Sequence, residues 1–116
     1  MVCAGVYHKH IPVAVKVLQS GEGLASREDD FIDEAKCLMQ LSHEHVVRFV
    51  GLSCTARPFF LVTELLSNGN LRTCLQNNVI AGDSIEQLFD VCMQTAAACE
   101  YLESRRFVLH RDLAAR

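Results

Sequence analysis

The sequence lacks the features that mark several large classes of protein. It has no tryptophan, only two prolines, and no apolar run near the roughly 18 residues that a membrane-spanning helix requires. The 116 residues are 50% hydrophobic and carry a formal net charge of only −3, a composition that excludes an intrinsically disordered chain. The same weak negative charge argues against a broad nucleic-acid-binding surface. The composition is that of a folded domain with a core of its own.

Disulfides and structural metal sites are not expected either. The six cysteines form no C-x-x-C pair, and several stand where a small apolar residue would serve in a strand or helix. The first residues, MVCAGVYHKH, lack the basic start and apolar stretch of a secretory signal peptide. We therefore expect reduced thiols in a cytoplasmic protein. The pairs His8/His10 and His43/His45 have no Cys or carboxylate cluster at zinc-finger spacing.

Runs of β-prone residues mark the first half of the chain. The first two runs are separated by a loop that ends at Pro12, which we place at a strand entrance, where its missing N–H does least harm. The predicted strands are residues 2–7, 13–18, 46–54 and 59–64.

One helix is predicted between the second and third strands. Ser26 is its expected N-cap, and the acidic run of residues 28–30 would then lie at the positive end of the helix dipole. An apolar stripe with helical spacing follows at Phe31, Ala35, Leu38 and Leu41.

The second half of the chain is predicted to be helical. A short helix is expected around residues 71–75, then a loop over 77–83 and a long helix over 84–103, with Ser84 and Gln87 in capping-box positions. Strands with one helix, followed by helices only, indicate an α+β protein. The apolar face predicted for the long helix consists of Ile85, Leu88, Phe89, Cys92, Ala96, Cys99 and Leu102.

Lys16 is a cation in an otherwise apolar strand, Val13-Ala14-Val15-Lys16. Burying an unpaired ammonium is costly, so this lysine needs an anionic partner unless it lies on an edge strand and reaches solvent. Glu34 is the candidate partner because it lies beside the apolar stripe of the predicted helix. An isolated helix carboxylate is otherwise usually an exposed surface group.

Residues 110–116, HRDLAAR, follow a long amphipathic helix and cluster His, Arg and Asp. Together with VAVK at 13–16 and FIDEA at 31–35, in that order, they resemble the catalytic domain of protein kinases, and of tyrosine kinases in particular. HRDLAAR is similar to the start of the catalytic loop of this family. VAVK is similar to its lysine strand, and FIDEA to the helix segment that supplies the partner of the lysine.

The resemblance covers nearly the whole chain and implies a protein-kinase-like α+β fold that is incomplete. Residues 1–64 would form the N-lobe, an antiparallel sheet with one helix and without the glycine-rich loop. Residues 65–70 would be the hinge, and residues 71–116 the first helices of the helical C-lobe up to the catalytic loop.

The resemblance also implies an ATP site. Lys16 would hold the α- and β-phosphates and be oriented by Glu34. For Val2 and Ala14 the alternative role is core packing, and an apolar surface of this kind is also compatible with binding adenine. Val2 and Ala14 would pack on the adenine ring, Thr63 would take the gatekeeper position, and Glu64 and Leu66 would offer backbone groups to the adenine edge.

In the catalytic loop, the resemblance gives Asp112 the role of accepting or orienting the proton of the substrate hydroxyl. Arg111 would help to position the catalytic loop and would bind a phosphorylated activation loop. His110 would stabilise the catalytic loop by packing and hydrogen bonding. Serine/threonine kinases usually carry a lysine where Ala114 stands. Here the compensating cation is Arg116, as in tyrosine kinases. The implied activity is transfer of a phosphoryl group from ATP, with Mg²⁺, to tyrosine in protein substrates in the cytoplasm, without a nucleic-acid partner or a membrane segment.

Three departures from the family pattern stand beside these matches. The glycine-rich loop is not present before Val2 and Gly5, which resemble the V-x-x-G that follows it. The metal-binding asparagine of the family would come directly after Arg116, and Leu109 reads as a one-residue insertion. We therefore expect no phosphorylation of poly(Glu,Tyr) by the 116 residues alone, weak ATP affinity at most, and marginal stability.

Two other readings stay open: a non-catalytic interaction fragment, and an incomplete gene model of a kinase. The subfamily is also open, since residues 11–16 look Src-like and residues 101–104 are closer to the Fes/Fer group. A receptor origin is compatible with the sequence as well.

Overall fold

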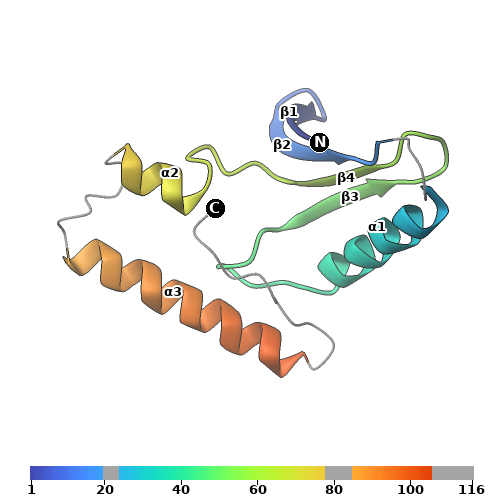
Figure 1. The fold of residues 1–116 in the computed structure, drawn as a ribbon. Coiled ribbons are helices and arrows are strands. Elements are labelled where there is room, and N and C mark those ends of the chain that lie inside the picture. Colours follow the sequence, from blue (N-terminus) through green and yellow to red (C-terminus); the bar gives the residue numbers. More distant parts are fainter. Residues whose placement is uncertain (20–23, 78–84, 106–116) are drawn as a thin grey trace. The chain divides into compact units, whose positions relative to one another are not determined.

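The computed structural model describes residues 1–19, 24–77 and 85–105 (Figure 1). The chain divides into two compact units, Met1–Leu65 and Leu66–Arg116. The first unit contains a sheet and one helix, and the described part of the second contains helices. These elements confirm the predicted α+β class. No helix in the described ranges is long and apolar enough to cross a membrane.

The sheet of the first unit has four antiparallel strands in the order β1-β2-β4-β3. Each of the four predicted strands is present. The first has the predicted bounds, the fourth ends at the predicted residue, and the other strand ends differ from the prediction by one to three residues. The strands are β1 (Val2–Tyr7), β2 (Ile11–Val17), β3 (Phe49–Ser53) and β4 (Phe60–Glu64).

Strand β2 begins before Pro12, which stands opposite Val6 of β1. Pairing of β2 with β4 begins only at Val13. Pro12 therefore lies outside the length of β2 that is hydrogen-bonded on both sides, where a missing N–H is tolerated. The hairpin between β1 and β2 turns through His8 and Lys9, whose φ angles of 48° and 67° fall in the left-handed region.

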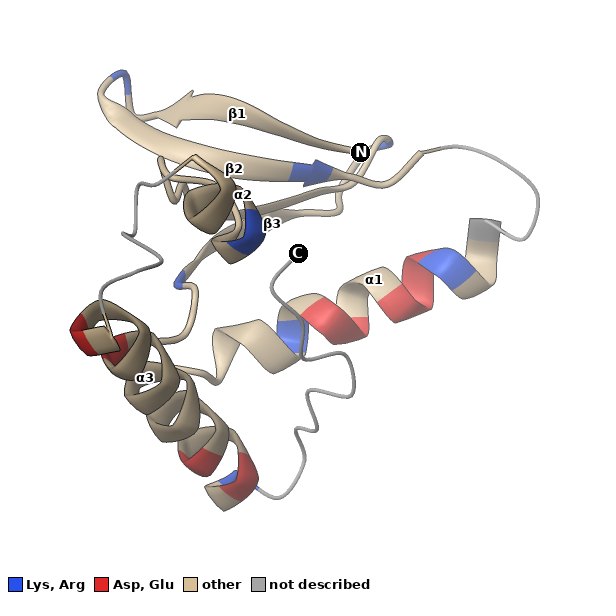
Figure 2. Ribbon diagram, turned by 60° about the vertical axis from the view of Figure 1, so that its left-hand side comes forward, with Lys and Arg blue, Asp and Glu red and all other residues tan. Residues whose placement is uncertain are grey.

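Helix α1 (Leu24–Met39) lies along the sheet beside β3 (Figure 1). The prediction that Ser26 caps this helix is wrong, because the helix begins before it and Ser26 lies within the first turn. The first turn carries no acidic residue, so Glu28 and its neighbours do not sit at the helix start. Figure 2 shows acidic residues along the length of α1, whereas the strands carry few charged residues.

The core of the first unit forms where α1 meets the sheet. Phe31 and Ala35 of the predicted stripe are buried together with Leu61 of β4. Leu41 lies beyond the end of the helix, where its N–H donates to the Leu38 carbonyl oxygen at 3.1 Å. The partly buried residues packed around this core are Leu18, Leu38, Phe49, Leu52 and Phe59.

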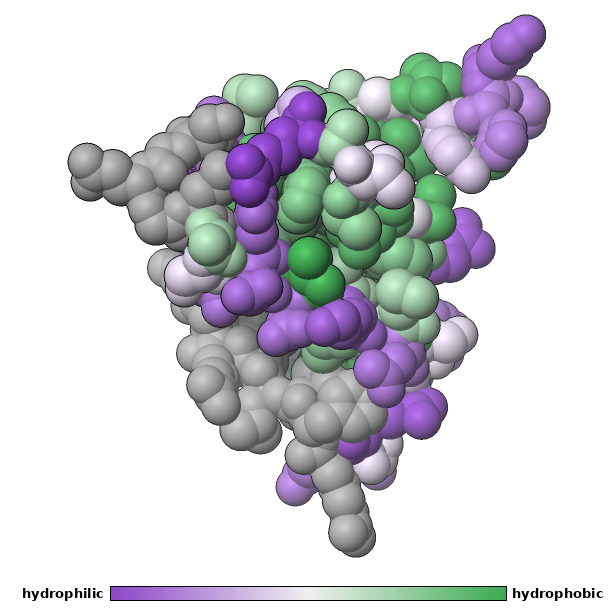
Figure 3. Space-filling model, turned by 90° about the vertical axis from the view of Figure 1, so that its right-hand side faces the viewer, coloured by the Kyte–Doolittle hydropathy of each residue, from purple (hydrophilic) through white to green (hydrophobic). Residues whose placement is uncertain are grey.

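Several apolar side chains of the β1–β2 hairpin remain exposed: Val2, Val6, Tyr7 and Ile11. β1 forms one edge of the sheet, so its side chains have a strand neighbour on one side only. Figure 3 shows hydrophobic residues at the surface with hydrophilic residues around them.

The second unit begins with the predicted short helix, α2 (Leu71–Gln76). Asn70 caps it, since its side-chain oxygen accepts the Thr73 N–H at 2.8 Å. Cys74 is the buried residue of this helix. The predicted loop over 77–83 and the cap at Ser84 fall outside the described residues, apart from Asn77, which ends α2.

Helix α3 (Ile85–Ser104) agrees with the long predicted helix, but its predicted face is only partly right. Leu102 is buried and Leu88 and Cys99 are half-buried, whereas the other predicted positions are exposed: Ile85, Phe89, Cys92 and Ala96. The reason is that apolar residues occur on more than one side of this helix, so periodicity does not single out one face. The half-buried positions that follow Leu88 with helical spacing are Val91, Thr95, Ala98 and Cys99.

Candidate functional site

One face of the sheet gathers four of the predicted site residues. Val2 stands opposite Lys16, and Ala14 stands opposite Thr63. Directly opposed residues of neighbouring strands share a face, as do residues two apart on one strand. Val2, Ala14, Lys16 and Thr63 therefore lie on the same face of the sheet, over three adjacent strands. Leu61 stands opposite Lys16 on this same face and connects it to the core.

The predicted ion pair between Lys16 and Glu34 is present. The Nζ atom of Lys16 lies 2.7 Å from Oε1 and 2.5 Å from Oε2 of Glu34. β2 lies between β1 and β4, so the alternative of an edge-strand lysine is wrong. The two side chains are nevertheless 42% and 43% exposed, so the pair is accessible from solvent.

Helix packing places Glu34 at this position. Ala35, the next residue, is completely buried against the sheet, and Phe31 is buried one turn earlier. The Phe31 ring also approaches the pair, with its centroid 5.9 Å from Lys16 Nζ. The sequence identified Phe31 only as a core residue. Its position next to the ammonium shows that the core of the unit and the ion pair are contiguous.

The end of β4 has a different arrangement. Glu64 stands opposite Val13, so its side chain is directed to the other face than that of Thr63. The Glu64 carboxylate accepts the Arg48 N–H at 2.8 Å, and the Glu64 N–H donates to the Arg48 carbonyl oxygen at 3.0 Å. The Thr63 hydroxyl donates to the Glu64 carbonyl oxygen at 3.4 Å. Leu66, the first residue of the second unit, is exposed.

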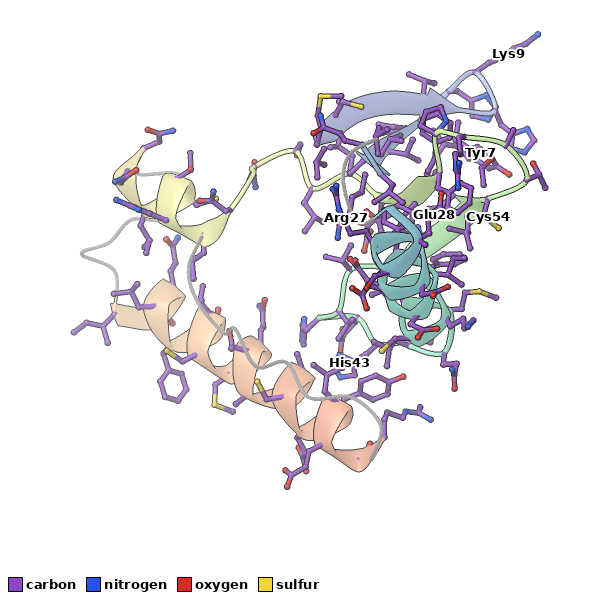
Figure 4. All side chains as sticks on the ribbon, turned by 45° about the vertical axis from the view of Figure 1, so that its right-hand side comes forward. Tyr7, Lys9, Arg27, Glu28, His43 and Cys54 are labelled. Carbon is purple, nitrogen blue, oxygen red and sulfur yellow. The ribbon has the colours of Figure 1, made fainter. Side chains whose placement is uncertain are left out.

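A second ion pair joins α1 to the turn between β3 and β4, and sequence reasoning missed it. Arg57 Nε lies 2.6 Å from Glu28 Oε1, and Arg57 Nη2 lies 3.0 Å from Glu28 Oε2. Glu28 stands seven residues before buried Ala35, on the same side of the helix, and this spacing was the available signal. Figure 4 shows Arg27 and Glu28 pointing in different directions from α1.

The Arg57–Glu28 ion pair shifts the pKa values of both side chains. The hydrogen bonds from Arg57 lower the pKa of Glu28 below its ordinary value of 4.5, against an opposing effect of partial burial, and the positive charge of Arg57 adds to the lowering. The same contacts with Glu28 raise the pKa of Arg57. The pair is therefore charged throughout the neutral range.

The described residues offer no ligand set for a metal ion: no group of three or more His, Cys, Asp or Glu side chains among them could hold one. His43 and His45 lie together in the loop after α1, with ring centroids 5.5 Å apart. This loop borders a cavity of about 350 Å³. The cavity is lined by Leu41, Ser42, His43, Glu44, Val46 and Arg48.

The catalytic-loop residues predicted from the sequence, His110, Arg111, Asp112 and Arg116, fall outside the described residues, and so does Leu109. Of the predicted nucleotide site, Lys16 and Glu34 are in contact, and Val2, Ala14 and Thr63 share their side of the sheet.

Comparison with known proteins places the whole chain in one family. Residues 1–116 match the family model for protein tyrosine and serine/threonine kinases. The chain therefore belongs to the protein tyrosine and serine/threonine kinase family, as its motifs predicted.

The similar curated proteins are tyrosine-protein kinases. The chain is 39% identical over 112 residues to tyrosine-protein kinase TXK of Homo sapiens, an alignment that covers 97% of this chain and 20% of that protein. It is 38% identical over 114 residues to cytoplasmic tyrosine-protein kinase BMX of Mus musculus, covering 97% and 16%. Tyrosine-protein kinase FRK of Homo sapiens is 35% identical over 112 residues, with 97% and 21% covered. The chain thus spans about a fifth of the length of these relatives.

Proposed function

We propose that this chain forms the nucleotide-binding part of an ATP-dependent protein tyrosine kinase, which acts in the cytoplasm on tyrosine residues of protein substrates. The observation that carries this proposal is the Lys16–Glu34 ion pair, on the face of the sheet that also holds Val2, Ala14 and Thr63. The names of the similar proteins support the tyrosine specificity.

The ion pair suits a phosphate-binding role. An ammonium group has three N–H donors. In this site, the Glu34 carboxylate accepts from Lys16 with both oxygens, and the 42% exposure of the lysine side chain leaves it open to a further acceptor. A phosphate oxygen can therefore bind Lys16 without displacing Glu34. Glu34 fixes where the positive charge stands before the ligand arrives, which lowers the ordering cost of binding.

The rest of the face suits the adenine base. Val2 and Ala14 offer uncharged side chains on which an adenine ring can pack, and Thr63 borders the same surface. The backbone groups of Glu64 and Leu66 would hydrogen-bond the adenine edge. The residues 1–64, 65–70 and 71–116 would correspond to the N-lobe, the hinge and the start of the C-lobe.

When bound, ATP supplies the phosphoryl group that is transferred. Asp112 would accept or orient the proton of the attacking tyrosine hydroxyl, and Arg116 would place positive charge near the transferring group. Arg111 and His110 would hold the loop that carries them. Mg²⁺ would accompany the nucleotide.

The experiment is calorimetric titration of the chain with ATP and Mg²⁺, compared with two lysine variants. Lys16→Met removes the proposed phosphate contact. Lys36→Met is the matched control, because Lys36, which lies on α1, also pairs with a carboxylate, that of Asp33, at 2.7 Å. We expect Lys16→Met to weaken ATP binding by about tenfold or more, equivalent to about 1.4 kcal/mol, and Lys36→Met to leave it unchanged.

Adenosine separates the base from the phosphates. It lacks the phosphates that Lys16 would bind, so its affinity should be the same for the chain and for Lys16→Met. No ATP binding at millimolar concentration, or equal losses in the two lysine variants, would contradict the proposal.

A further inference from the structure

Helix α1 is attached to the sheet unit by two ion pairs six residues apart, at Glu28 and at Glu34. Glu34 reaches Lys16 of β2, and Glu28 reaches Arg57 in the turn that leads into β4. The side chain of Glu28 is only 15% exposed, so this carboxylate lies against the protein surface. The Arg57 side chain is 62% exposed.

Glu28 continues the buried stripe of the helix. Residues 28, 31, 35 and 38 recur at spacings of three, four and three, which keeps them on one side. Phe31 and Ala35 on this stripe are buried against Leu61. Apolar contacts of this kind are non-directional, so they hold the helix against the sheet but do not by themselves fix where it lies along its axis.

The Arg57–Glu28 pair is a directional contact and therefore fixes the position of the helix along its axis. Two N–H groups of one guanidinium meet the two oxygens of one carboxylate, at 2.6 and 3.0 Å. A two-point contact with this geometry constrains orientation as well as distance. Along a helix, six residues correspond to about 9 Å, so Glu28 and Glu34 lie less than two turns apart on one rigid element. A shift of α1 that breaks one pair also displaces the other.

We propose that Arg57 and Glu28 are positioning residues for the nucleotide site: their two-point contact holds α1 where Glu34 meets Lys16. The expected consequence for ligand binding rests on the proposed function: loss of the Arg57–Glu28 contact should lower the affinity for the phosphates of the nucleotide. The positioning role also makes a claim that needs no nucleotide, namely that Lys16 is released from Glu34 when Arg57 is removed.

The first test measures the release directly. Lys16 and Lys36 are labelled in the same sample with an amine-reactive ester, and the rate at each is followed by mass spectrometry of peptides. In Arg57→Ala, the labelling rate of Lys16 should rise to that in Glu34→Gln, while the rate of Lys36 stays as in the parent chain. The control Arg27→Ala, which removes a nearby exposed arginine of α1, should change neither. An unchanged Lys16 rate in Arg57→Ala would overturn the proposal.

The second test measures the consequence for ligand. Arg57→Ala should weaken ATP binding several-fold in the parent chain but less than twofold when Glu34→Gln is already present, because both changes act through Lys16. Adenosine affinity should not change. Equal losses for ATP and adenosine, or additive losses with Glu34→Gln, would show a general structural role and overturn the positioning role.

Rescue variants distinguish loss of the Arg57–Glu28 contact from loss of the folded structure. Exchanging the charges in Glu28→Arg with Arg57→Glu should restore the slow labelling of Lys16. Arg57→Lys keeps the charge but not the two-point contact, so it should restore labelling only in part. If Lys16 labelling responds as stated while the parent chain binds no ATP, the proposed function fails and the positioning role stands.

Discussion

Replacing Lys16 by methionine should hardly change the stability of the first unit, although it removes the charge at the centre of the proposed site. Both members of the Lys16–Glu34 pair are more than 40% exposed. Ion pairs with this exposure contribute only about 0.2–1 kcal/mol, because water screens them and two long side chains must be ordered. Methionine keeps an unbranched apolar stem that can remain near Phe31.

The comparison variant is Leu61→Ala on the adjacent strand. Leu61 stands opposite Lys16 and is 2% exposed, packed with Phe31 and Ala35. Truncating a buried leucine to alanine costs about 2–5 kcal/mol, through lost transfer free energy and the cavity left behind. The two neighbouring positions should thus differ several-fold in their effect on the free energy of unfolding.

Urea unfolding followed by circular dichroism measures both variants. We expect the free energy of unfolding to fall by less than about 1 kcal/mol for Lys16→Met and by at least about 2 kcal/mol for Leu61→Ala. If Lys16→Met costs as much as Leu61→Ala, the ion pair is a structural element of the sheet. The proposed role of the pair in binding the nucleotide, with little contribution to folding, would then be refuted.

Three further outcomes are expected. Lys9→Gly should raise the free energy of unfolding by about 0.5–1 kcal/mol, because Lys9 has a φ of 67° that glycine adopts without strain; a lower stability in urea unfolding would contradict this. Asn70→Ala should cost about 1 kcal/mol, since it removes the cap that accepts the Thr73 N–H, and an unchanged helical circular dichroism and thermal midpoint would argue against it. Because the pKa of Glu28 is lowered by Arg57, its contribution is present above the ordinary pKa of 4.5 and is lost as the pH falls through the lower value of the folded state. The stability difference between the parent chain and Glu28→Gln should therefore be constant above about pH 5.5 and shrink below it; a difference that grows on acidification would be incompatible with the pair.

The strands and the first ion pair could be predicted from the sequence because both depend on short-range patterns. Apolar and β-branched runs marked the strands, and a cation in an apolar strand required a partner that the neighbouring helix could supply. Lys16 and Glu34 are only 18 residues apart in the chain.

The start of α1 and the face of α3 depend on contacts that local patterns do not contain. Ser26 is a good capping residue, but the helix continues before it, and Glu28 is held by an arginine 29 residues away. In α3, the helical spacing of Ile85 and Phe89 predicted that they belong to the buried face, yet both are exposed. Only packing against other elements decides between such faces.

The central claim is that the face formed by Val2, Ala14, Lys16 and Thr63 binds ATP. It is tested most directly by following the backbone amide resonances of the chain during titration with ATP and Mg²⁺. We expect the largest shifts at these four residues and at Glu64. No shift at millimolar ATP, or shifts confined to the loop around His43, would contradict the claim.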